Sequence, residues 1–163
     1  MPSISFRSAS ADDDQFLFDL FCSAPHFALL PLQGSQREQL LRMQYEAQLR
    51  AFRAEFPGSH YDIVLLNGCA AGQFRLARRD SDFYLVDIAI ASEARNTGIG
   101  TAILRQIQSE AEACGKPVRS SVFRFNPGSL RFHQRLGFEI AGEDEVRWRL
   151  EWRPANATIP TCL

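Results

Sequence analysis

The sequence of 163 residues contains only four cysteines, and their spacing matches no common metal-binding pattern. Cys22, Cys69, Cys114 and Cys162 are far apart and include no Cys-x-x-Cys pair. This spacing argues against a zinc site and against a dense disulfide framework, so we expect no metal. Reduced thiols are typical of the cytoplasm, which is where we expect the protein to work.

The sequence also lacks a strong charge of either sign and a long apolar run. Its formal net charge of −1 argues against nucleic-acid binding as the main function. No apolar stretch has the length needed to cross a membrane, and the N-terminus has no basic segment followed by an apolar run, so we expect no signal peptide. The remaining composition, with 45% hydrophobic residues, is typical of a globular domain with its own core.

One stretch joins a predicted buried strand to a predicted amphipathic helix. The run Leu85–Ile90 has strand length, and apolar residues recur at helical spacing from Ile99 to Ala111. Between them, Gly98 and Gly100 allow close approach to the backbone, and Arg95 adds positive charge. The free N–H groups and dipole of the helix favour an anion at this junction, such as a pyrophosphate. A tight turn without a ligand is the alternative.

Two sequence motifs identify the kind of anion. No Gly-Lys-Ser/Thr follows the glycines, and the third glycine of a dinucleotide fingerprint would fall at Ile103. The segment 95–100, Arg-Asn-Thr-Gly-Ile-Gly, instead resembles the acetyl-CoA motif of the GNAT superfamily of N-acetyltransferases, (Gln or Arg)-x-x-Gly-x-(Gly or Ala). The segment 126–138 resembles the second motif of that family, an Asn that opens a helix, a Tyr seven residues later and a Gly-Phe pair. The Tyr position holds His133 here.

The periodicity predicts an α/β fold with a mixed sheet of about seven strands flanked by helices. The element order is β-α-α-β-β-β-α-β-α-β-β, in one domain over residues 1–153 with a flexible tail over 154–163. The GNAT resemblance adds a splay between the central strand (83–90) and the following strand (117–123), with acetyl-CoA in the gap. The alternating segment 146–152, which holds both tryptophans, is a candidate edge for a homodimer.

The resemblance implies three groups of cofactor-binding residues. The central strand would pair with the pantetheine arm, the glycine-containing loop would hold the pyrophosphate, and the second motif would flank the thiol end. In that order the residues are Ile88, Ala89 and Ile90; Arg95, Asn96, Thr97, Gly98, Ile99, Gly100 and Thr101; and Asn126, Ser129 and Phe132.

Two residues are candidates for proton transfer. His133 stands where the family's Tyr donates a proton to the leaving thiolate, and an imidazolium could do the same. Asp87 is the one charge in the central strand and could accept the amine proton through water. The alternatives are a polar helix residue for His133 and a structural carboxylate for Asp87. Glu93, His26 and His60 have less positional support.

The segment 24–35 is predicted to be a loop, and the GNAT resemblance implies that it helps to form the wall of the acceptor-substrate site. Its candidate substrate contacts are His26, Phe27, Leu29 and Leu30, with a packed surface loop as the alternative. The wall is mostly apolar, which favours a small apolar or amino-acid-like amine. The resemblance therefore implies an acetyl-CoA-dependent N-acetyltransferase, and the alternative is a non-catalytic acyl-CoA-binding module of the same fold. No nucleic acid or membrane partner is expected.

Overall fold

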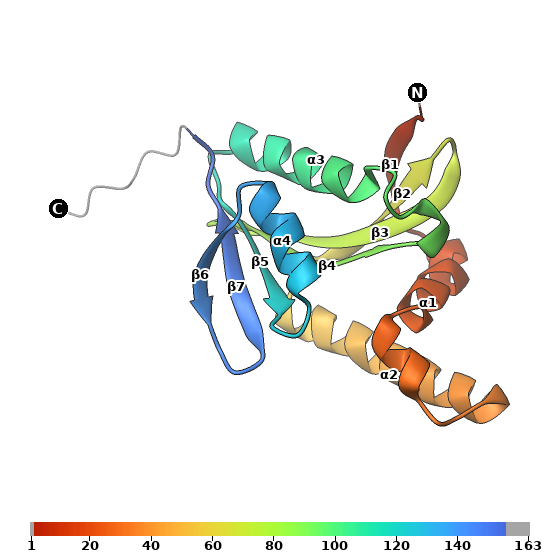
Figure 1. The fold of residues 1–163 in the computed structure, drawn as a ribbon. Helices are drawn as coiled ribbons and strands as arrows, with labels where there is room; N and C mark the ends of the chain where they lie inside the picture. Colours follow the sequence, from red (N-terminus) through yellow and green to blue (C-terminus); the bar gives the residue numbers. More distant parts are fainter. Residues whose placement is uncertain (1, 156–163) are drawn as a thin grey trace. The chain divides into compact units, whose positions relative to one another are not determined.

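The computed structural model describes residues 2–155, which form an α/β fold with a seven-stranded mixed sheet (Figure 1). The strands are hydrogen bonded in the order β1-β2-β3-β4-β5-β7-β6. The strands are β1 (Ile4–Ser8), β2 (His60–Leu66), β3 (Cys69–Arg78), β4 (Phe83–Ile90), β5 (Val118–Phe123), β6 (Glu139–Glu143) and β7 (Arg147–Trp152). The α-helices are α1 (Asp14–Cys22), α2 (Gly34–Glu55), α3 (Ile99–Ala113) and α4 (Pro127–Arg135). The predicted fold class and element order are confirmed.

The chain forms two compact units. The first comprises residues 1–77 and 87–99, and the second comprises residues 78–86 and 100–163. The boundary therefore crosses β4 after Val86 and falls after the first residue of α3, Ile99. From residue 156 on, the tail predicted for 154–163 lies outside the described residues, whereas Pro154 is buried.

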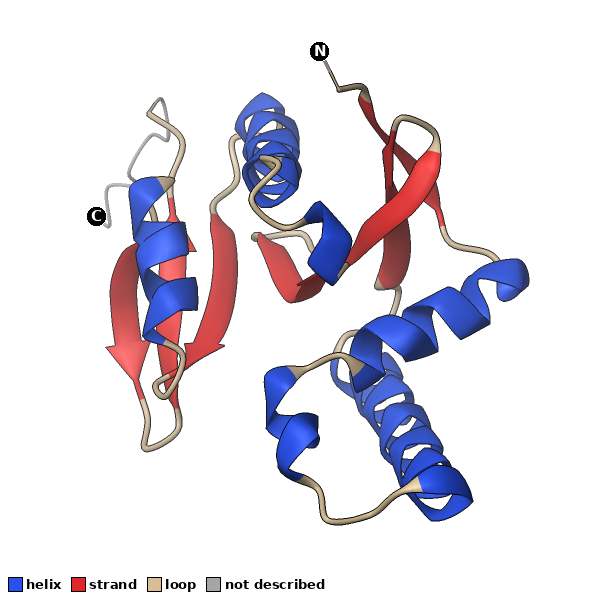
Figure 2. Cartoon of the chain, turned by 45° about the vertical axis from the view of Figure 1, so that its right-hand side comes forward, coloured by secondary structure: helices blue, strands red, loops and turns tan. Residues whose placement is uncertain are grey.

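The core of the first unit lies between its helices and β2. Figure 2 shows α1 crossing α2, with the short 3-10 helix η2 (Pro25–Leu29) in the segment that joins them. Apolar and aromatic side chains from these elements bury one another. The buried members are Leu17, Phe18, Phe27, Leu41, Tyr45, Tyr61 and Ile63. The sequence predicts a loop over 24–35. The burial of Phe27 explains why part of that segment is folded into a helical turn instead.

A cap and an ion pair fix the short 3-10 helix η1 (Ala11–Asp13), which leads directly into α1. The backbone N–H of Ser10 donates to Asp13 Oδ2 at 2.8 Å, as expected for an N-terminal capping residue. Arg7 on β1 donates to both carboxylate oxygens of Asp13, each at 2.8 Å. These bonds lower the pKa of Asp13 to about 2, so the helix is held to β1 by an ionised group across the neutral range.

In the second unit, β4 pairs with β5 over a short parallel ladder. Phe83–Leu85 face Val118–Ser120, and both strands continue past this ladder. That is the arrangement that the predicted splay requires. Helix α4 packs against β5 (Figure 2).

The predicted dimer edge is corrected by the sheet order. Strand β7 pairs along its whole length with β5 on one side and with β6 on the other. The segment with both tryptophans therefore has no free edge, and β6 is the outer strand of this unit.

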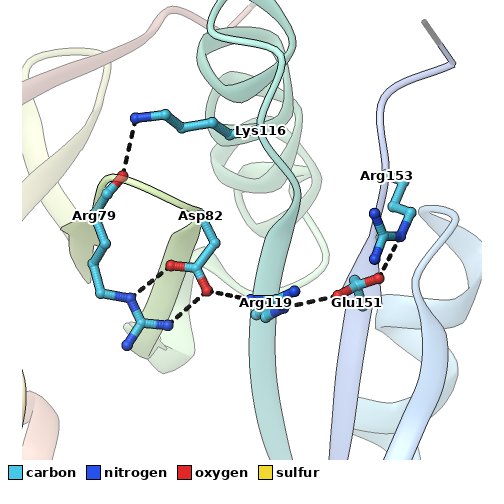
Figure 3. Close-up of polar contacts among 6 residues, drawn as sticks. All are labelled: Arg79, Asp82, Lys116, Arg119, Glu151 and Arg153. Atoms are coloured by element: carbon cyan, nitrogen blue, oxygen red, sulfur yellow. Dashed lines mark hydrogen bonds and ion pairs between the residues drawn. The ribbon is translucent and has the colours of Figure 1, made fainter. Parts of the chain in front are cut away.

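A chain of ion pairs lies at the ladder (Figure 3). The fully buried carboxylate of Asp82 accepts hydrogen bonds from Arg79 and Arg119. Arg119 also donates to Glu151 on β7 at 2.8 Å, and Glu151 pairs with Arg153. The network therefore connects the turn before β4, the strand β5 and the end of β7.

Candidate active site

The glycine-containing loop leads from the end of β4 into α3. Residues 95–98 are exposed, whereas Ile99 is buried and anchors the first turn of the helix. Asn96 and Gly98 have positive φ angles of 61° and 85°. The hydroxyl of Thr97 donates to the carbonyl of Ala94, in the 3-10 helix η3 (Ser92–Ala94).

This loop has the features of an anion site. Arg95 is exposed, and its Nε donates to the carbonyl of Ile90 at 3.4 Å. A Cβ at Gly98 would meet no atom within 4 Å, so the space above the backbone is open. The first N–H groups of an α-helix have no acceptor within the helix, and in α3 they follow the exposed residues 95–98.

Asp87 lies in the first unit, against a buried amide that the sequence analysis did not single out. Gln73 on β3 donates from Nε2 to Asp87 Oδ2 at 2.9 Å. Asp87 as a whole residue is partly exposed, but its carboxyl group is buried, and this burial raises the pKa of the carboxyl. Hydrogen bonds from Gln73 and the Ile88 N–H and the charge of Arg75 oppose this shift without cancelling it.

The side chains around this carboxylate come from β2 and β3. In the antiparallel ladder Tyr61 faces Arg75 and Ile63 faces Gln73, so these four share one face. Arg75 is buried, and its guanidinium lies 4.8 Å from the centre of the Tyr61 ring. The strand β3 is thus covered on both faces, including the face that carries its polar residues.

His133 lies in the second unit, on α4, and is 2% exposed. Its Nδ1 is 2.8 Å from the carbonyl of Ser129, which makes Nδ1–H the donor in the neutral ring. Nε2 is buried and has no hydrogen-bond partner among residues 2–155. Burial lowers the pKa of His133, against the opposing effect of the Ser129 carbonyl. The ring is therefore neutral at pH 7 and presents an unprotonated Nε2.

The remaining residues of the second motif occupy the start of α4. The side chain of Asn126 accepts a hydrogen bond from the Ser129 N–H at 3.1 Å and caps the helix. Pro127 takes the first helical position, where its missing N–H leaves no hydrogen bond unmade. Phe132 is half-buried, with its ring 5.4 Å from that of His133.

The four predicted acceptor contacts divide into two kinds. Phe27 belongs to the core of the first unit, and Leu30 packs against that core. His26 is exposed but lies over the Phe27 ring at 4.1 Å, and Leu29 is 87% exposed. Glu93 and His60 are also exposed.

Two properties concern residues 2–155 as a whole. None of the helices there is long and apolar enough to cross a membrane. The same residues contain no group of three or more His, Cys, Asp or Glu side chains arranged to hold a metal ion.

Comparison with known proteins gives one family match. The model of the acetyltransferase (GNAT) family matches residues 25–138. No curated protein matches the chain by sequence.

Several solved structures share the fold. The PaiA N-acetyltransferase of Thermoplasma acidophilum in complex with coenzyme A has a TM-score of 0.71 and 18% identity, over 93% of this chain and 99% of that chain. The ribosomal-protein-S18-alanine N-acetyltransferase of Escherichia coli has a TM-score of 0.69 and 17% identity, over 100% of both chains. Ard1 of Thermoplasma volcanium has a TM-score of 0.67 and 15% identity, over 94% of this chain and 99% of that chain.

Proposed function

Because this chain belongs to the acetyltransferase (GNAT) family, we propose that it transfers the acetyl group of acetyl-CoA to a primary amine of a small molecule, peptide or protein. The observation that carries the proposal is the exposed loop 95–98 before α3, whose residues match the family's acetyl-CoA motif. The coenzyme A in the related Thermoplasma acidophilum structure supports the same ligand. The open space above Gly98 fits a pyrophosphate close to the backbone.

The proposed reaction is a direct attack of the amine on the thioester. The nitrogen forms a bond to the acetyl carbon, the carbon–sulfur bond breaks, and the thiolate leaves with the electron pair. An ammonium substrate must lose two protons: one leaves before the attack, and one leaves from the nitrogen after it. Asp87 is the proposed acceptor of the first, because its raised pKa makes it a stronger base than an ordinary aspartate. The second balances the charge of the thiolate.

His133 is the proposed donor of the proton that the thiolate gains. Nδ1–H is held by the Ser129 carbonyl, so the transferred proton must occupy Nε2, which is free of other partners in residues 2–155. Because the ring is neutral at pH 7, Nε2 must first take up a proton, and the second proton that the nitrogen loses supplies it. The lowered pKa then makes the protonated ring a stronger acid than an ordinary imidazolium. Replacement by tyrosine, the usual residue of the family's second motif, should keep single-turnover acetyl transfer within about tenfold, whereas H133A should lose a larger factor. Equal rates for H133A and the unchanged protein would remove His133 from the reaction.

The first experiment is a calorimetric titration of the protein with acetyl-CoA, with NAD as the control ligand. We expect binding of acetyl-CoA alone, and R95A should weaken it by about tenfold to a hundredfold because a charge-assisted bond to phosphate is lost. R37A is the matched control, because Arg37 is a partly exposed arginine on α2 outside the loop. Absence of acetyl-CoA binding would overturn the proposal.

A release assay then separates an enzyme from a non-catalytic acyl-CoA-binding module. Free thiol is measured after acetyl-CoA is mixed with a panel of primary amines, and amine-dependent release identifies a transferase. Binding without release for any amine would favour the module. The neutral state of His133 favours this second candidate, because a neutral ring has no proton on Nε2 to donate to the thiolate.

Two further proposals concern setting and assembly. We place the protein in the cytoplasm, where acetyl-CoA and reduced thiols are available. We also propose a homodimer whose interface is not formed by an edge of β7. Light scattering of the purified protein at several concentrations tests this proposal.

A further inference from the structure

Gln73 is a buried amide with one half of its hydrogen-bonding capacity unused. It is 4% exposed, and its Nε2 donates to Asp87 Oδ2 at 2.9 Å. Its Oε1 is buried and has no hydrogen-bond partner among residues 2–155. A buried oxygen without a partner costs free energy, and most such groups in folded proteins are satisfied. A hydrogen-bond donor from outside residues 2–155 would therefore satisfy the Gln73 oxygen.

The neighbouring carboxylate of Asp87 accepts hydrogen bonds from Gln73 and the Ile88 N–H, but it makes no ion pair within residues 2–155. Arg75 is the cation whose charge acts on Asp87, but its guanidinium is directed elsewhere. Its Nε donates to the Ser59 hydroxyl at 2.9 Å, and its Nη2 donates to the Ser59 carbonyl at 3.0 Å. No ion pair within residues 2–155 involves Asp87. The hydrogen bond from Gln73 Nε2 thus places a negative carboxylate beside an amide whose carbonyl oxygen has no partner among residues 2–155.

The chemistry of this pair selects a particular kind of guest. Both groups accept hydrogen bonds, and one of them is negatively charged, so the complementary guest is a cation with at least two N–H donors. An alkylammonium ion has three such donors. A hydroxyl or thiol has a single donor and no charge, and it would leave one of the two oxygens unsatisfied.

We infer that the acceptor amine enters as an ammonium ion that donates to both Asp87 and the Oε1 of Gln73, with Gln73 as a positioning residue. The inference rests on the proposed function, since an amine is the proposed acceptor, and it names the ionic form and the residue that selects it. An N–H bond of the ammonium then breaks, an O–H bond forms on Asp87, and the amine is left neutral with its lone pair free. The proton and both charges are accounted for within this pair.

The position of Gln73 explains why an amide suits this role. Its Nε2 holds Asp87 in place, and its Oε1 is fixed on the other side of the same planar group. A single side chain therefore orients the base and binds the guest. The buried ladder position beside Ile63 restricts its movement, which preorganises the site.

The test is a binding measurement that needs neither acetyl-CoA nor turnover. Protein labelled with 13C at the aspartate carboxyl carbon is titrated with phenethylamine, n-butylamine and glycinamide, and with 2-phenylethanol as the neutral counterpart. D87N assigns the Asp87 resonance. We expect at least one amine to shift that resonance with saturation, and the alcohol to leave it unchanged. A shift by the alcohol equal to that of the amine, or no shift by any of the three amines, would overturn the inference.

The role of Gln73 is tested by substitution, with the buried Gln108 as the matched control residue. Q73M keeps the size of the side chain and removes both polar atoms, and we expect amine affinity to fall by about tenfold or more. Q73E keeps an acceptor oxygen and should retain ammonium binding. Q108M is the control, because Gln108 is also 4% exposed and donates to the Leu136 carbonyl at 2.7 Å, in the second unit. Equal amine affinities for Q73M and Q108M would contradict the role of Gln73.

Kinetics supply a second readout once an acceptor is known. Q73M should raise the KM for the amine and leave the KM for acetyl-CoA unchanged, a split that general loss of stability does not produce. The two hypotheses can fail separately. Amine binding at Asp87 without thiol release would contradict the proposed function alone. Amine-dependent thiol release without any shift of the Asp87 resonance would contradict this inference alone.

Discussion

Arg119 donates a hydrogen bond of 2.8 Å to the carboxylate of Asp82, which is fully buried. The bond ties β5 to the turn before β4 (Figure 3). In the adjacent ladder Arg119 faces Tyr84. Burial by itself would raise the pKa of Asp82, but the hydrogen bonds from Arg79 and Arg119 outweigh it, and the pKa lies below its ordinary value. The ionised form is therefore the one that the fold selects.

Removing the charge of Asp82 should destabilise the protein. D82N leaves two arginines without their shared carboxylate, and we expect the free energy of unfolding to fall by about 3 kcal/mol, the lower end for a broken buried ion pair. Arg79 and Arg119 are partly exposed, which is why the lower end applies. Urea denaturation at pH 7 measures the loss. D80N, at the exposed neighbouring position, is the control and should change little.

The same carboxylate predicts an acid-sensitive stability. A folded pKa below the unfolded one gives a contribution to stability that is present above the unfolded value of 3.8 and is lost as the pH falls through the folded pKa. The unchanged protein should therefore lose more stability than D82N between pH 5 and pH 3. Parallel pH profiles for the two proteins would show that Asp82 is not selectively ionised.

His133 should make the stability depend on pH nearer to neutrality. Its folded pKa lies below its ordinary value of 6.5, so the unfolded chain binds more protons in the window below 6.5. Stability from this group is complete above pH 6.5 and falls with acidification, at no more than about 1.4 kcal/mol per pH unit. H133F should flatten the urea-midpoint profile between pH 7 and pH 5.5, and H26A, at an exposed histidine, should not.

Much of the fold follows from local patterns in the sequence. The alternation of segments such as 146–152 and the helical spacing from Ile99 require no tertiary information, because periodicity is fixed by strand and helix geometry. The Asn67-Gly68 pair predicts the β2–β3 hairpin, and both residues have the positive φ that such a turn needs. The family resemblance that the two motifs predict is confirmed by the match over residues 25–138.

The other features depend on which surfaces meet in the folded chain. The alternation along β3 indicates a polar face with Gln73 and Arg75, but it does not say that this face is buried. The edge of the sheet is likewise a matter of pairing: β5 pairs with β7 and not with β6, which precedes β7 in the chain. The protonation of His133 depends on burial and on the Ser129 carbonyl, neither of which a motif encodes.

Gly98 gives a prediction that separates cofactor binding from stability. With φ at 85°, an alanine there is strained, and G98A should cost about 1 kcal/mol of stability. The strain should also reshape the proposed pyrophosphate loop and weaken acetyl-CoA binding in calorimetry. G115A is the matched control: Gly115 follows α3 with φ at 66°, and a Cβ there also meets nothing within 4 Å. Equal acetyl-CoA affinities for the two variants would contradict a role for the loop.

Asp87 should show opposite effects on stability and on activity. Its folded pKa is raised above the ordinary value of 3.8, so the folded protein binds more protons in the window above 3.8, and ionisation at neutral pH opposes folding. D87N removes that charge while its amide oxygen can still accept from Gln73, so its urea midpoint at pH 7 should rise. Acetyl transfer should fall by about a hundredfold to ten-thousandfold, the usual loss when a general base is removed. D12N, an exposed aspartate outside the site, should change neither quantity. A D87N protein that is less stable and fully active would mean that Asp87 is a structural carboxylate, because a structural group contributes to folding and a proton acceptor in a poorly solvated position detracts from it.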